Sequence, residues 1–267
     1  MKVYLNNMLL SDNETRIDPV DRGLTLGDGL YETVAVRNGR PARVAAHLAR
    51  LRQGAHVVGL EVPKDDRALE SALNEVAQAN AIGEGVLRLT LTRGPAGHGL
   101  AMPDSATPTL LIIGRAQRLA PAPLTSAIVA TVTRRNENSP TSRIKTTNCL
   151  DAVLALREAV ESGADDALLL NGAGKLAEAT TANLFAVIDG KLVTPPVADG
   201  ALAGVMRGAV IKELGAEERS IAPADLAGAS EAFLTSSLRV RPLIAVDGQA
   251  IGNGEPGPVT ARAQQIV

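Results

Sequence analysis

Cysteine, histidine and aromatic residues are scarce in this sequence. Its 267 residues include one Cys, three His, two Tyr and two Phe, and no Trp. A single cysteine cannot form an internal disulfide, so we expect a reducing compartment and a cytoplasmic protein. So few aromatic side chains argue against stacking platforms for single-stranded nucleic acid. The widely spaced histidines, without an HExxH or CxxC motif, predict no protein-built metal site.

An excess of positive charge and long apolar runs are also lacking. Lys and Arg total 27 against 29 for Asp and Glu, a formal net charge of −2, so nucleic acid and membrane surfaces are not expected partners. No stretch approaches the roughly 20 apolar residues of a membrane span. The first residues lack the basic region and apolar run of a signal peptide. A hydrophobic share of 45% predicts a folded chain with a sizeable core.

The first part of the chain combines two helical patterns with several strand patterns. Apolar residues recur at helical spacing over residues 44–59 and 67–81. Residues 86–94 alternate as a strand, and the short apolar run at 109–114 is typical of a buried strand. The proline-containing segment 116–124 predicts a linker.

Beyond this linker the pattern of strands and helices begins again. Asn148 is placed to cap a helix over residues 149–162, which Gly163 would end. Short strands joined by tight turns follow this helix. We therefore predict an α/β chain of two α+β lobes, a small N-terminal domain at 1–115 and a larger C-terminal domain at 125–267.

Lys145 differs from the other five lysines in its surroundings. It lies in RIKTTNCLDAV, just ahead of the predicted helix, beside hydroxyl side chains and without an acidic neighbour. A helix start and burial both favour the uncharged form of an amine, which is the form that a Schiff-base nucleophile needs. A solvated loop lysine would have the same local sequence, so this segment alone leaves both interpretations open.

Glu178 and Arg50 are two further candidates. Glu178 is the only charged residue of LAEATTANLF; because an unpaired buried carboxylate is costly, it either faces solvent or pairs with a cation. Arg50, in HLARL, is either a surface arginine or a ligand contact. The loop RGPAGHGL at 93–100 lacks the Lys-Ser/Thr ending of a phosphate loop. Its glycines favour a backbone that bends close to a ligand.

Several segments together resemble the class IV pyridoxal-phosphate enzymes, which include branched-chain aminotransferase, D-amino-acid aminotransferase and aminodeoxychorismate lyase. They occur in order between about residues 4 and 248, and they read DRGLTLGDGLYETVAVRNGRP, HLARL, RGPAGHG, RIKTTNCLDAVLALREAVESGADDALLLN, LAEATTANLFAV and GVMRG. The resemblance implies the two-domain fold-type IV architecture, pyridoxal 5'-phosphate as cofactor, an amino or keto acid as substrate, and a homodimer.

The resemblance also implies a role for each candidate. Lys145 would hold pyridoxal phosphate as a Schiff base, Glu178 would pair with its pyridine nitrogen, and Arg50 would bind its phosphate. Further phosphate contacts would come from two backbone amides at a helix start and from a serine pair, at Val205, Met206, Ser236 and Ser237. Met206 stands where aminotransferases usually have threonine.

Details of the motifs favour the lyase reaction, which converts 4-amino-4-deoxychorismate to p-aminobenzoate and pyruvate. Tyr31-Glu32-Thr33 resembles the Phe-Glu-Thr of lyases, and the resemblance places Thr33 among the catalytic residues. The loop RGPAGHGL has the lyase spacing, but His98 stands where arginine is common. We therefore expect Tyr31, Arg93 and His98 to contact the substrate, with either Arg93 or Arg239 supplying the missing charge.

An aminotransferase is the alternative reaction. It would move an amino group between a D- or branched-chain amino acid, or an amine, and a 2-keto acid. Both reactions begin when the freed lysine removes a proton from the carbon that bears the nitrogen. A non-catalytic binding protein of the same fold would be favoured if Lys145 or Glu178 were replaced, and both are present.

Overall fold

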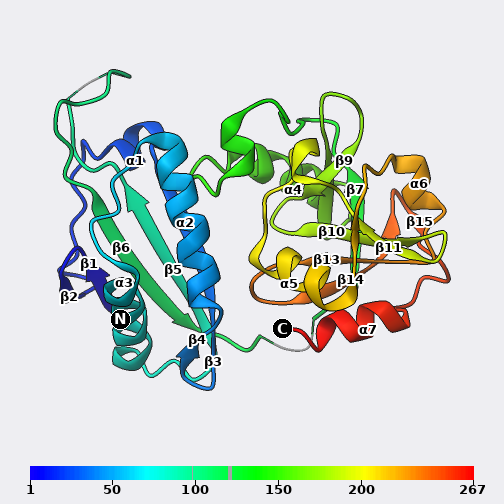
Figure 1. Ribbon diagram of the computed structural model, residues 1–267, viewed down its shortest axis with the longest axis horizontal. Coiled ribbons are helices and arrows are strands. Elements are labelled where there is room, and N and C mark those ends of the chain that lie inside the picture. The colour runs from blue at the N-terminus through cyan, green and yellow to red at the C-terminus, as the bar shows by residue number, and fades with distance from the viewer. Residues whose placement is uncertain (98, 120–121) are drawn as a thin grey trace. The chain divides into compact units, whose positions relative to one another are not determined.

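The computed structural model describes residues 1–97, 99–119 and 122–267, which divide into two compact units (Figure 1). The first unit comprises Met1–Leu119 and the short segment Ile144–Asn148, and the second comprises the other described residues. The sequence placed this short segment, with Lys145, in the C-terminal domain. It belongs to the first unit because its backbone bonds to that unit: Tyr31 N donates to Lys145 O, and Thr147 N donates to Gly29 O, both at 3.0 Å.

The first unit contains a six-stranded antiparallel sheet with the strand order β2-β1-β6-β5-β3-β4. Its strands are β1 (Lys2–Leu5), β2 (Met8–Ser11), β3 (Gly29–Arg37), β4 (Arg40–Pro41), β5 (Gly85–Thr92) and β6 (Thr109–Ala116). Its helices are α1 (Arg22–Leu26), α2 (Val44–Val58) and α3 (Asp66–Ala79). Helices α2 and α3 lie over one face of this sheet (Figure 1).

The side chains of β3 point alternately to the two faces of the sheet, and only one set packs against helices α2 and α3. Leu30, Val34 and Val36 are buried in one cluster with apolar residues of α2 and α3. Successive side chains of a strand point to opposite faces. Tyr31 and Thr33 therefore lie on the sheet face opposite these helices, and both are only partly buried.

The second unit is built on a nine-stranded mixed sheet with the order β12-β11-β10-β13-β14-β7-β8-β9, and β15 pairs with β14. Its strands are β7 (Thr125–Val129), β8 (Asp166–Leu170), β9 (Leu176–Ala179), β10 (Asn183–Ile188), β11 (Lys191–Thr194), β12 (Glu217–Glu218), β13 (Glu231–Thr235), β14 (Val240–Val246) and β15 (Gln249–Ala250). Its α-helices are α4 (Leu150–Glu161), α5 (Val205–Leu214), α6 (Pro223–Ala227) and α7 (Pro258–Gln264). Two 3-10 turns cover Pro140–Arg143 and Val197–Asp199.

The predicted cap of the helix after Lys145 is wrong. Helix α4 begins at Leu150, and the residue before it, Cys149, makes no side-chain cap hydrogen bond. The side chain of Asn148 instead donates from Nδ2 to Gly27 O at 3.0 Å. Cys149 occupies the cap position, so Asn148 lies one residue too early to cap the helix. Its amide nitrogen instead ties the segment to the end of α1 in the first unit.

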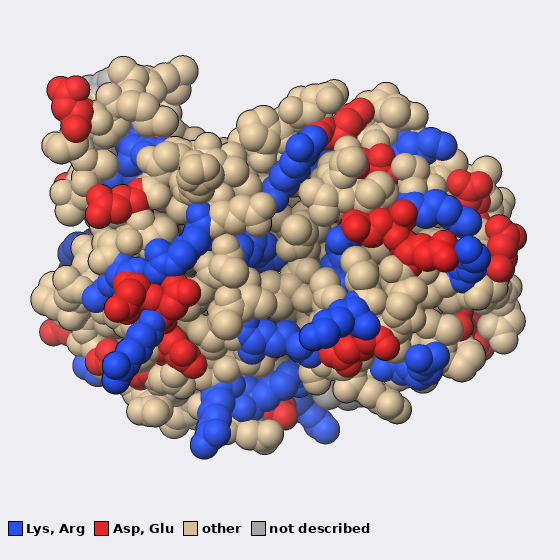
Figure 2. Space-filling view, in the orientation of Figure 1, with Lys and Arg blue, Asp and Glu red and all other residues tan. Residues whose placement is uncertain are grey.

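The surface carries both signs of charge. Lys and Arg are interspersed with Asp and Glu over the face that Figure 2 shows, consistent with the formal net charge of −2. Among the described residues, none of the helices has the length and apolar character needed to cross a membrane.

Candidate active site

Backbone pairing with the start of β3 fixes the position of Lys145. Leu30 and Thr146 form an isolated β-bridge, and Thr147 Oγ1 donates to Gly27 O at 2.7 Å. These bonds hold the two residues that follow Lys145. Its Nζ lies 4.3 Å from the centroid of the Tyr31 ring, so the amine that the sequence singled out stands beside an aromatic side chain of β3.

A hollow in the first unit contains three of the predicted site residues. It is lined by Leu30, Tyr31, Glu32, Arg50, Leu51, Gly54 and Lys145. Lys145 comes from the segment after the 3-10 turn, Tyr31 from β3 and Arg50 from α2. The fold therefore brings together an amine, a phenol and a guanidinium that are far apart in the sequence.

Arg88 is a candidate that the sequence did not reveal. Its Cζ lies 3.8 Å from the centroid of the Tyr31 ring, a distance typical of a cation–π contact. Arg88 pairs directly with Thr33 across β5 and β3, and such pairs share a sheet face. The alternating pattern placed Arg88 off the core side of β5, but only the strand register places it beside Tyr31 and Thr33. A guanidinium there can bind a carboxylate.

Glu32 points to the other side of β3 and binds two residues of α2. It accepts hydrogen bonds from Arg50 Nε at 2.8 Å and Arg50 Nη2 at 2.6 Å, and His47 Nδ1 lies 2.6 Å from Glu32 Oε2. Burial raises the pKa of the Glu32 carboxyl, but hydrogen bonds and charge from Arg50 and His47 outweigh it, so this pKa lies below its usual value. Glu32 is therefore ionised at neutral pH.

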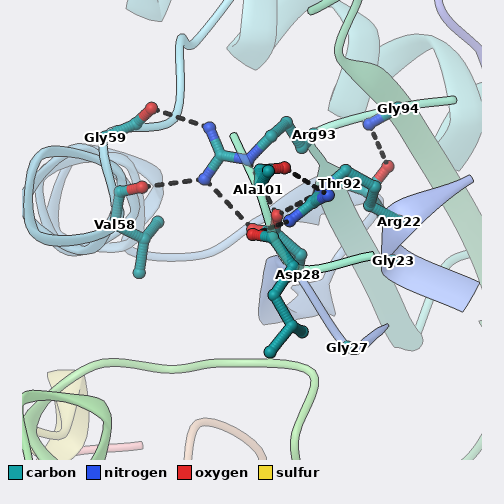
Figure 3. Close-up of polar contacts among 12 residues, drawn as sticks. Arg22, Gly23, Gly27, Asp28, Val58, Gly59, Thr92, Arg93, Gly94 and Ala101 are labelled. Atoms are coloured by element: carbon teal, nitrogen blue, oxygen red, sulfur yellow. Dashed lines mark hydrogen bonds and ion pairs between the residues drawn. The ribbon is translucent and has the colours of Figure 1, made fainter. Parts of the chain in front are cut away.

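Arg93, predicted to contact the substrate, is instead part of a buried cluster with Arg22 and Asp28 (Figure 3). Its Nε and Nη2 donate to the two carboxylate oxygens of Asp28 at 2.8 and 3.1 Å. Its Nη1 and Nη2 also donate to the carbonyls of Gly59 and Val58, both at 2.8 Å. All three guanidinium nitrogens are thus occupied within the first unit, so we do not retain Arg93 as a substrate contact.

The same carboxylate connects Arg93 to the loop that follows it. Arg22 Nε donates to Asp28 Oδ2 at 2.9 Å, and Arg22 Nη1 donates to the carbonyls of Gly99 and Ala101, both at 3.1 Å. Asp28 therefore bridges two arginines, one of which holds the loop backbone. His98, the other predicted substrate contact of this loop, lies outside the described residues.

Replacing Asp28 by asparagine is expected to destabilise the protein in a pH-dependent way. Burial raises the pKa of Asp28, but the bonds from Arg93 and Arg22 outweigh burial and hold this pKa below its usual value. A lowered folded-state pKa contributes stability above the unfolded pKa of about 3.9, and this contribution is lost as pH falls through the folded pKa. We expect D28N to lower the free energy of unfolding by about 2 kcal/mol at pH 7, because Arg93 and Arg22 lose charge-assisted hydrogen bonds to a partly buried carboxylate.

Urea unfolding of wild type and D28N at pH 7 and below pH 4 measures this effect. The difference between the two proteins should narrow at the lower pH, because below the unfolded pKa of about 3.9 the unfolded wild type binds a proton that the folded protein does not. An equal difference at both pH values would show that charge pairing is not what Asp28 contributes.

Glu178 lies on β9 of the second unit and is paired. Its Oε1 lies 3.2 Å from Arg135 Nη2 in an ion pair. Its Oε2 accepts hydrogen bonds from the backbone N of Leu202 at 2.9 Å and from Asn183 Nδ2 at 3.4 Å. The side chain of Glu178 is 11% exposed. Of the two interpretations that the sequence left open, pairing with a cation is therefore the one that the structure shows.

The start of α5 lies close to the partners of Glu178. Asn183 Nδ2 donates to Leu202 O at 2.8 Å, and a Cβ added to Gly204 would lie 2.0 Å from Asn183 Oδ1. Only glycine allows this close approach. Gly204 makes no side-chain cap bond, and the first amides of a helix lack intrahelical partners. The amides of Val205 and Met206 thus stand at the positive end of α5, a common anion-binding arrangement.

Ser236 and Ser237 directly follow β13, next to the same asparagine. Thr235, the last residue of β13, is the register partner of Asn183 in β10. Thr235 Oγ1 is buried and has no hydrogen-bond partner among the described residues. Asn183 therefore connects Glu178, the start of α5 and the serine segment, and nothing in the sequence indicated this role.

These two sets of residues have the chemistry that pyridoxal phosphate needs. The first unit offers an amine for an aldehyde, at Lys145, and a guanidinium for a phosphate, at Arg50. The second offers a carboxylate for a pyridine nitrogen, at Glu178, and amides and hydroxyls for a phosphate. Thr235 Oγ1, a buried hydroxyl without a partner among the described residues, fits a site completed by a ligand. The residues present therefore fit the cofactor.

Comparison with known proteins identifies the family. Residues 29–246 match the family model described as amino-transferase class IV, so the chain belongs to the class IV aminotransferase family. A D-alanine aminotransferase of Bacillus licheniformis is 31% identical over 99% of this chain and 95% of that protein. The branched-chain amino acid aminotransferase of Escherichia coli has a similar structure, with a TM-score of 0.92 and 26% identity over 99% of this chain and 92% of that one.

The match confirms the predicted fold and cofactor class. The chain has the two-domain fold-type IV architecture and is a pyridoxal-phosphate-dependent enzyme. Another branched-chain amino acid aminotransferase of similar structure was solved in complex with N-(5'-phosphopyridoxyl)-L-glutamate. It has a TM-score of 0.90 and 26% identity over 99% of this chain and 92% of that one.

The comparisons favour the alternative reaction over the one that the motifs favoured. A candidate 4-amino-4-deoxychorismate lyase of Legionella pneumophila is also similar, with a TM-score of 0.86 and 28% identity over 95% of each chain. The D-alanine and branched-chain aminotransferases named above each match over 99% of this chain. The lyase-like features of the sequence concern short segments, such as residues 31–33 and 93–100, whereas the aminotransferase matches extend over 99% of this chain.

Proposed function

We propose that this protein is an aminotransferase that moves an amino group from an amino acid to a 2-keto acid. The observation that carries the proposal is the placement of two cations on one aromatic ring, with Lys145 Nζ at 4.3 Å and Arg88 Cζ at 3.8 Å from the Tyr31 centroid. One supplies the reacting amine, and the other is placed to bind the carboxylate that every amino or keto acid carries. The aminotransferase relatives support this choice of reaction.

We assign the cofactor contacts as follows. Lys145 binds the aldehyde, Glu178 holds a proton on the pyridine nitrogen, and Arg50 binds the phosphate together with Val205, Met206, Ser236 and Ser237. When bound, the cofactor withdraws electrons from the substrate carbon that carries the nitrogen. Nζ of Lys145, released when the substrate amine takes its place on the aldehyde, would then remove the proton from that carbon as a general base. Thr33, on the same sheet face as Tyr31 and Arg88, orients the substrate.

The lyase remains the second candidate. It is favoured by the match at Tyr31-Glu32-Thr33, by the spacing of RGPAGHGL and by the lyase-like segments GVMRG and TSSLRVRP. The charge that the lyase spacing needs is not supplied by Arg93, because Asp28 and two carbonyls occupy its guanidinium. Either reaction could take this charge from Arg88, so the preference for the aminotransferase rests on the relatives.

Two assays separate these reactions. We expect the purified holoenzyme, mixed with D-alanine, L-leucine or L-glutamate, to convert its pyridoxal absorption to that of the pyridoxamine form with at least one of them. The three compounds also distinguish a D-amino acid substrate from branched-chain and acidic L-amino acids. Formation of p-aminobenzoate and pyruvate from 4-amino-4-deoxychorismate, without that conversion, would establish the lyase and overturn the proposal.

We further propose a cytoplasmic homodimer. Helix α4 buries Ala155 and Ala159 but exposes an apolar stripe on its outer side, at Leu150, Val153 and Val160, which are 57% to 69% exposed. A stripe of this kind supports contact with a second copy, because paired stripes would bury each other. The chain mass is 27.6 kDa, and analytical ultracentrifugation should give a particle of twice this mass. A monomer at micromolar concentration would contradict the dimer.

A further inference from the structure

Three buried side chains of the first unit form a chain of contacts that ends at the hollow with Lys145. His47 contacts Glu32, Glu32 contacts Arg50, and Arg50 lines the hollow. The side chains of Glu32 and His47 are 1% and 2% exposed, and that of Arg50 is 10% exposed. Glu32 and His47 are thus shielded from solvent, while Arg50 lies at the edge of the hollow.

Charge fixes the direction of each hydrogen bond in this group. The lowered pKa of Glu32 makes it a carboxylate, which only accepts hydrogen bonds. His47 must therefore carry a proton on Nδ1 and donate it to Glu32 Oε2, at 2.6 Å. Arg50 donates to both oxygens of the same carboxylate. One buried carboxylate is held by three donors from one helix, because His47 and Arg50 both belong to α2.

The pairing of Arg50 with both oxygens of Glu32 determines how the Arg50 guanidinium is oriented. Glu32 engages the edge of the guanidinium formed by Nε and Nη2, at 2.8 and 2.6 Å. The guanidinium is planar, so binding one edge fixes the direction of the others. An arginine loses much rotamer freedom when it binds an anion, and Glu32 fixes this side chain beforehand.

We propose that Glu32 and His47 are positioning residues that orient Arg50 to bind the phosphate of the cofactor, an inference that rests on the proposed function. Neither residue contacts the phosphate in this scheme. Glu32 fixes the plane of the Arg50 guanidinium, and His47 fixes Glu32 by holding one of its oxygens. Their contribution therefore reaches the ligand only through Arg50.

Cofactor binding with and without a phosphate tests this assignment. Cofactor-free protein is titrated with pyridoxal phosphate and, separately, with pyridoxal, and binding is followed by the change in absorbance. We expect Glu32→Gln to raise the Kd of pyridoxal phosphate roughly ten- to a hundredfold, the effect of losing charge-assisted hydrogen bonds. The Kd of pyridoxal should not change, because pyridoxal has no group for Arg50 to bind.

Two variants of His47 provide an independent measurement if Glu32→Gln fails to fold. His47→Ala removes the donor to Glu32 and should also raise the Kd of pyridoxal phosphate alone. His47→Asn places an amide nitrogen near the position of Nδ1, so it should restore most of the wild-type Kd. If His47 only stabilised the fold, His47→Ala would weaken the binding of pyridoxal as well as that of pyridoxal phosphate.

Asp28→Asn is the matched control. It also removes a carboxylate that pairs with arginine in the first unit, although Asp28 is only partly buried, and Asp28 does not line the hollow. Both Kd values should therefore stay at the wild-type level in this variant. In Glu32→Gln combined with Arg50→Gln, the loss for pyridoxal phosphate should not exceed that of Arg50→Gln alone, because both act through one guanidinium.

The possible failures are distinguishable. Suppose that wild type binds normally but Glu32→Gln and His47→Ala lose affinity equally for pyridoxal phosphate and pyridoxal. This result would overturn the positioning role and leave the proposed function intact. Additive losses in the double variant would overturn it as well. Wild-type protein that binds neither aldehyde would overturn the proposed function, and the positioning role with it.

Discussion

Replacing Lys145 by alanine is expected to remove the covalent attachment of the cofactor and to lower turnover by about 10⁴-fold or more. Two functions are lost at once, because the same Nζ binds the aldehyde and removes the substrate proton. The fold should survive, since the segment around Lys145 is held by backbone bonds to Tyr31 and Gly29 rather than by the lysine side chain. Absorption spectra and turnover of the purified variant measure both losses.

Lys191→Ala is the control for this variant. Lys191 lies on β11 and forms an exposed ion pair with Glu217, so its removal should leave the spectrum and the turnover unchanged. A small primary amine added to Lys145→Ala should restore part of the turnover, because it can replace the missing base. If Lys145→Ala retained the absorption band of the wild type, another group would have to hold the cofactor.

Replacing Glu178 by alanine is expected to leave some cofactor bound but to lower turnover roughly 10²- to 10³-fold. The carboxylate contributes a charge that holds a proton on the pyridine nitrogen, and alanine cannot supply it. Glu178→Gln tests the charge separately from the packing, because an amide oxygen can still accept from Leu202 N and Asn183 Nδ2, as the carboxylate does. Turnover at saturating cofactor is the measurement.

Glu158→Gln is the control in the same unit. Glu158 also accepts bonds from backbone amides, those of Thr131 and Val132, but it belongs to α4 and is not part of the group around Asn183. Its turnover should match wild type. Normal turnover in Glu178→Gln would show that the negative charge of Glu178 does not act on the cofactor, and the assignment would be wrong.

Local periodicity and rare residues made part of the molecule predictable from the sequence. The helical spacing of apolar residues at 44–59 and 67–81 corresponds to α2 and α3 within two residues, because a helix that packs on a sheet needs one apolar face. Lys145 and Glu178 stood out because each is a charged residue in an otherwise uncharged or hydroxyl-rich segment.

The partners of polar side chains were not predictable. Asn148 had the residue type and position of a cap, yet its amide binds Gly27 O. Arg93 had the charge for a substrate contact, yet its guanidinium is occupied by Asp28, Val58 and Gly59. A long polar side chain forms hydrogen bonds with the donors or acceptors that the fold brings near it. These partners come from segments that are distant in the sequence.

By itself, the amino-acid sequence indicated the family and the two-lobed α/β architecture and singled out Lys145 and Glu178 as candidates, because these depend on motifs, local spacing and residue type. Only the tertiary structure decided that Lys145 pairs with the N-terminal unit, that Arg88 lies beside Tyr31, and that Glu32 holds Arg50. These depend on which strands pair and in which register. Strand pairing is set by the packing of the whole unit, and no single segment encodes it.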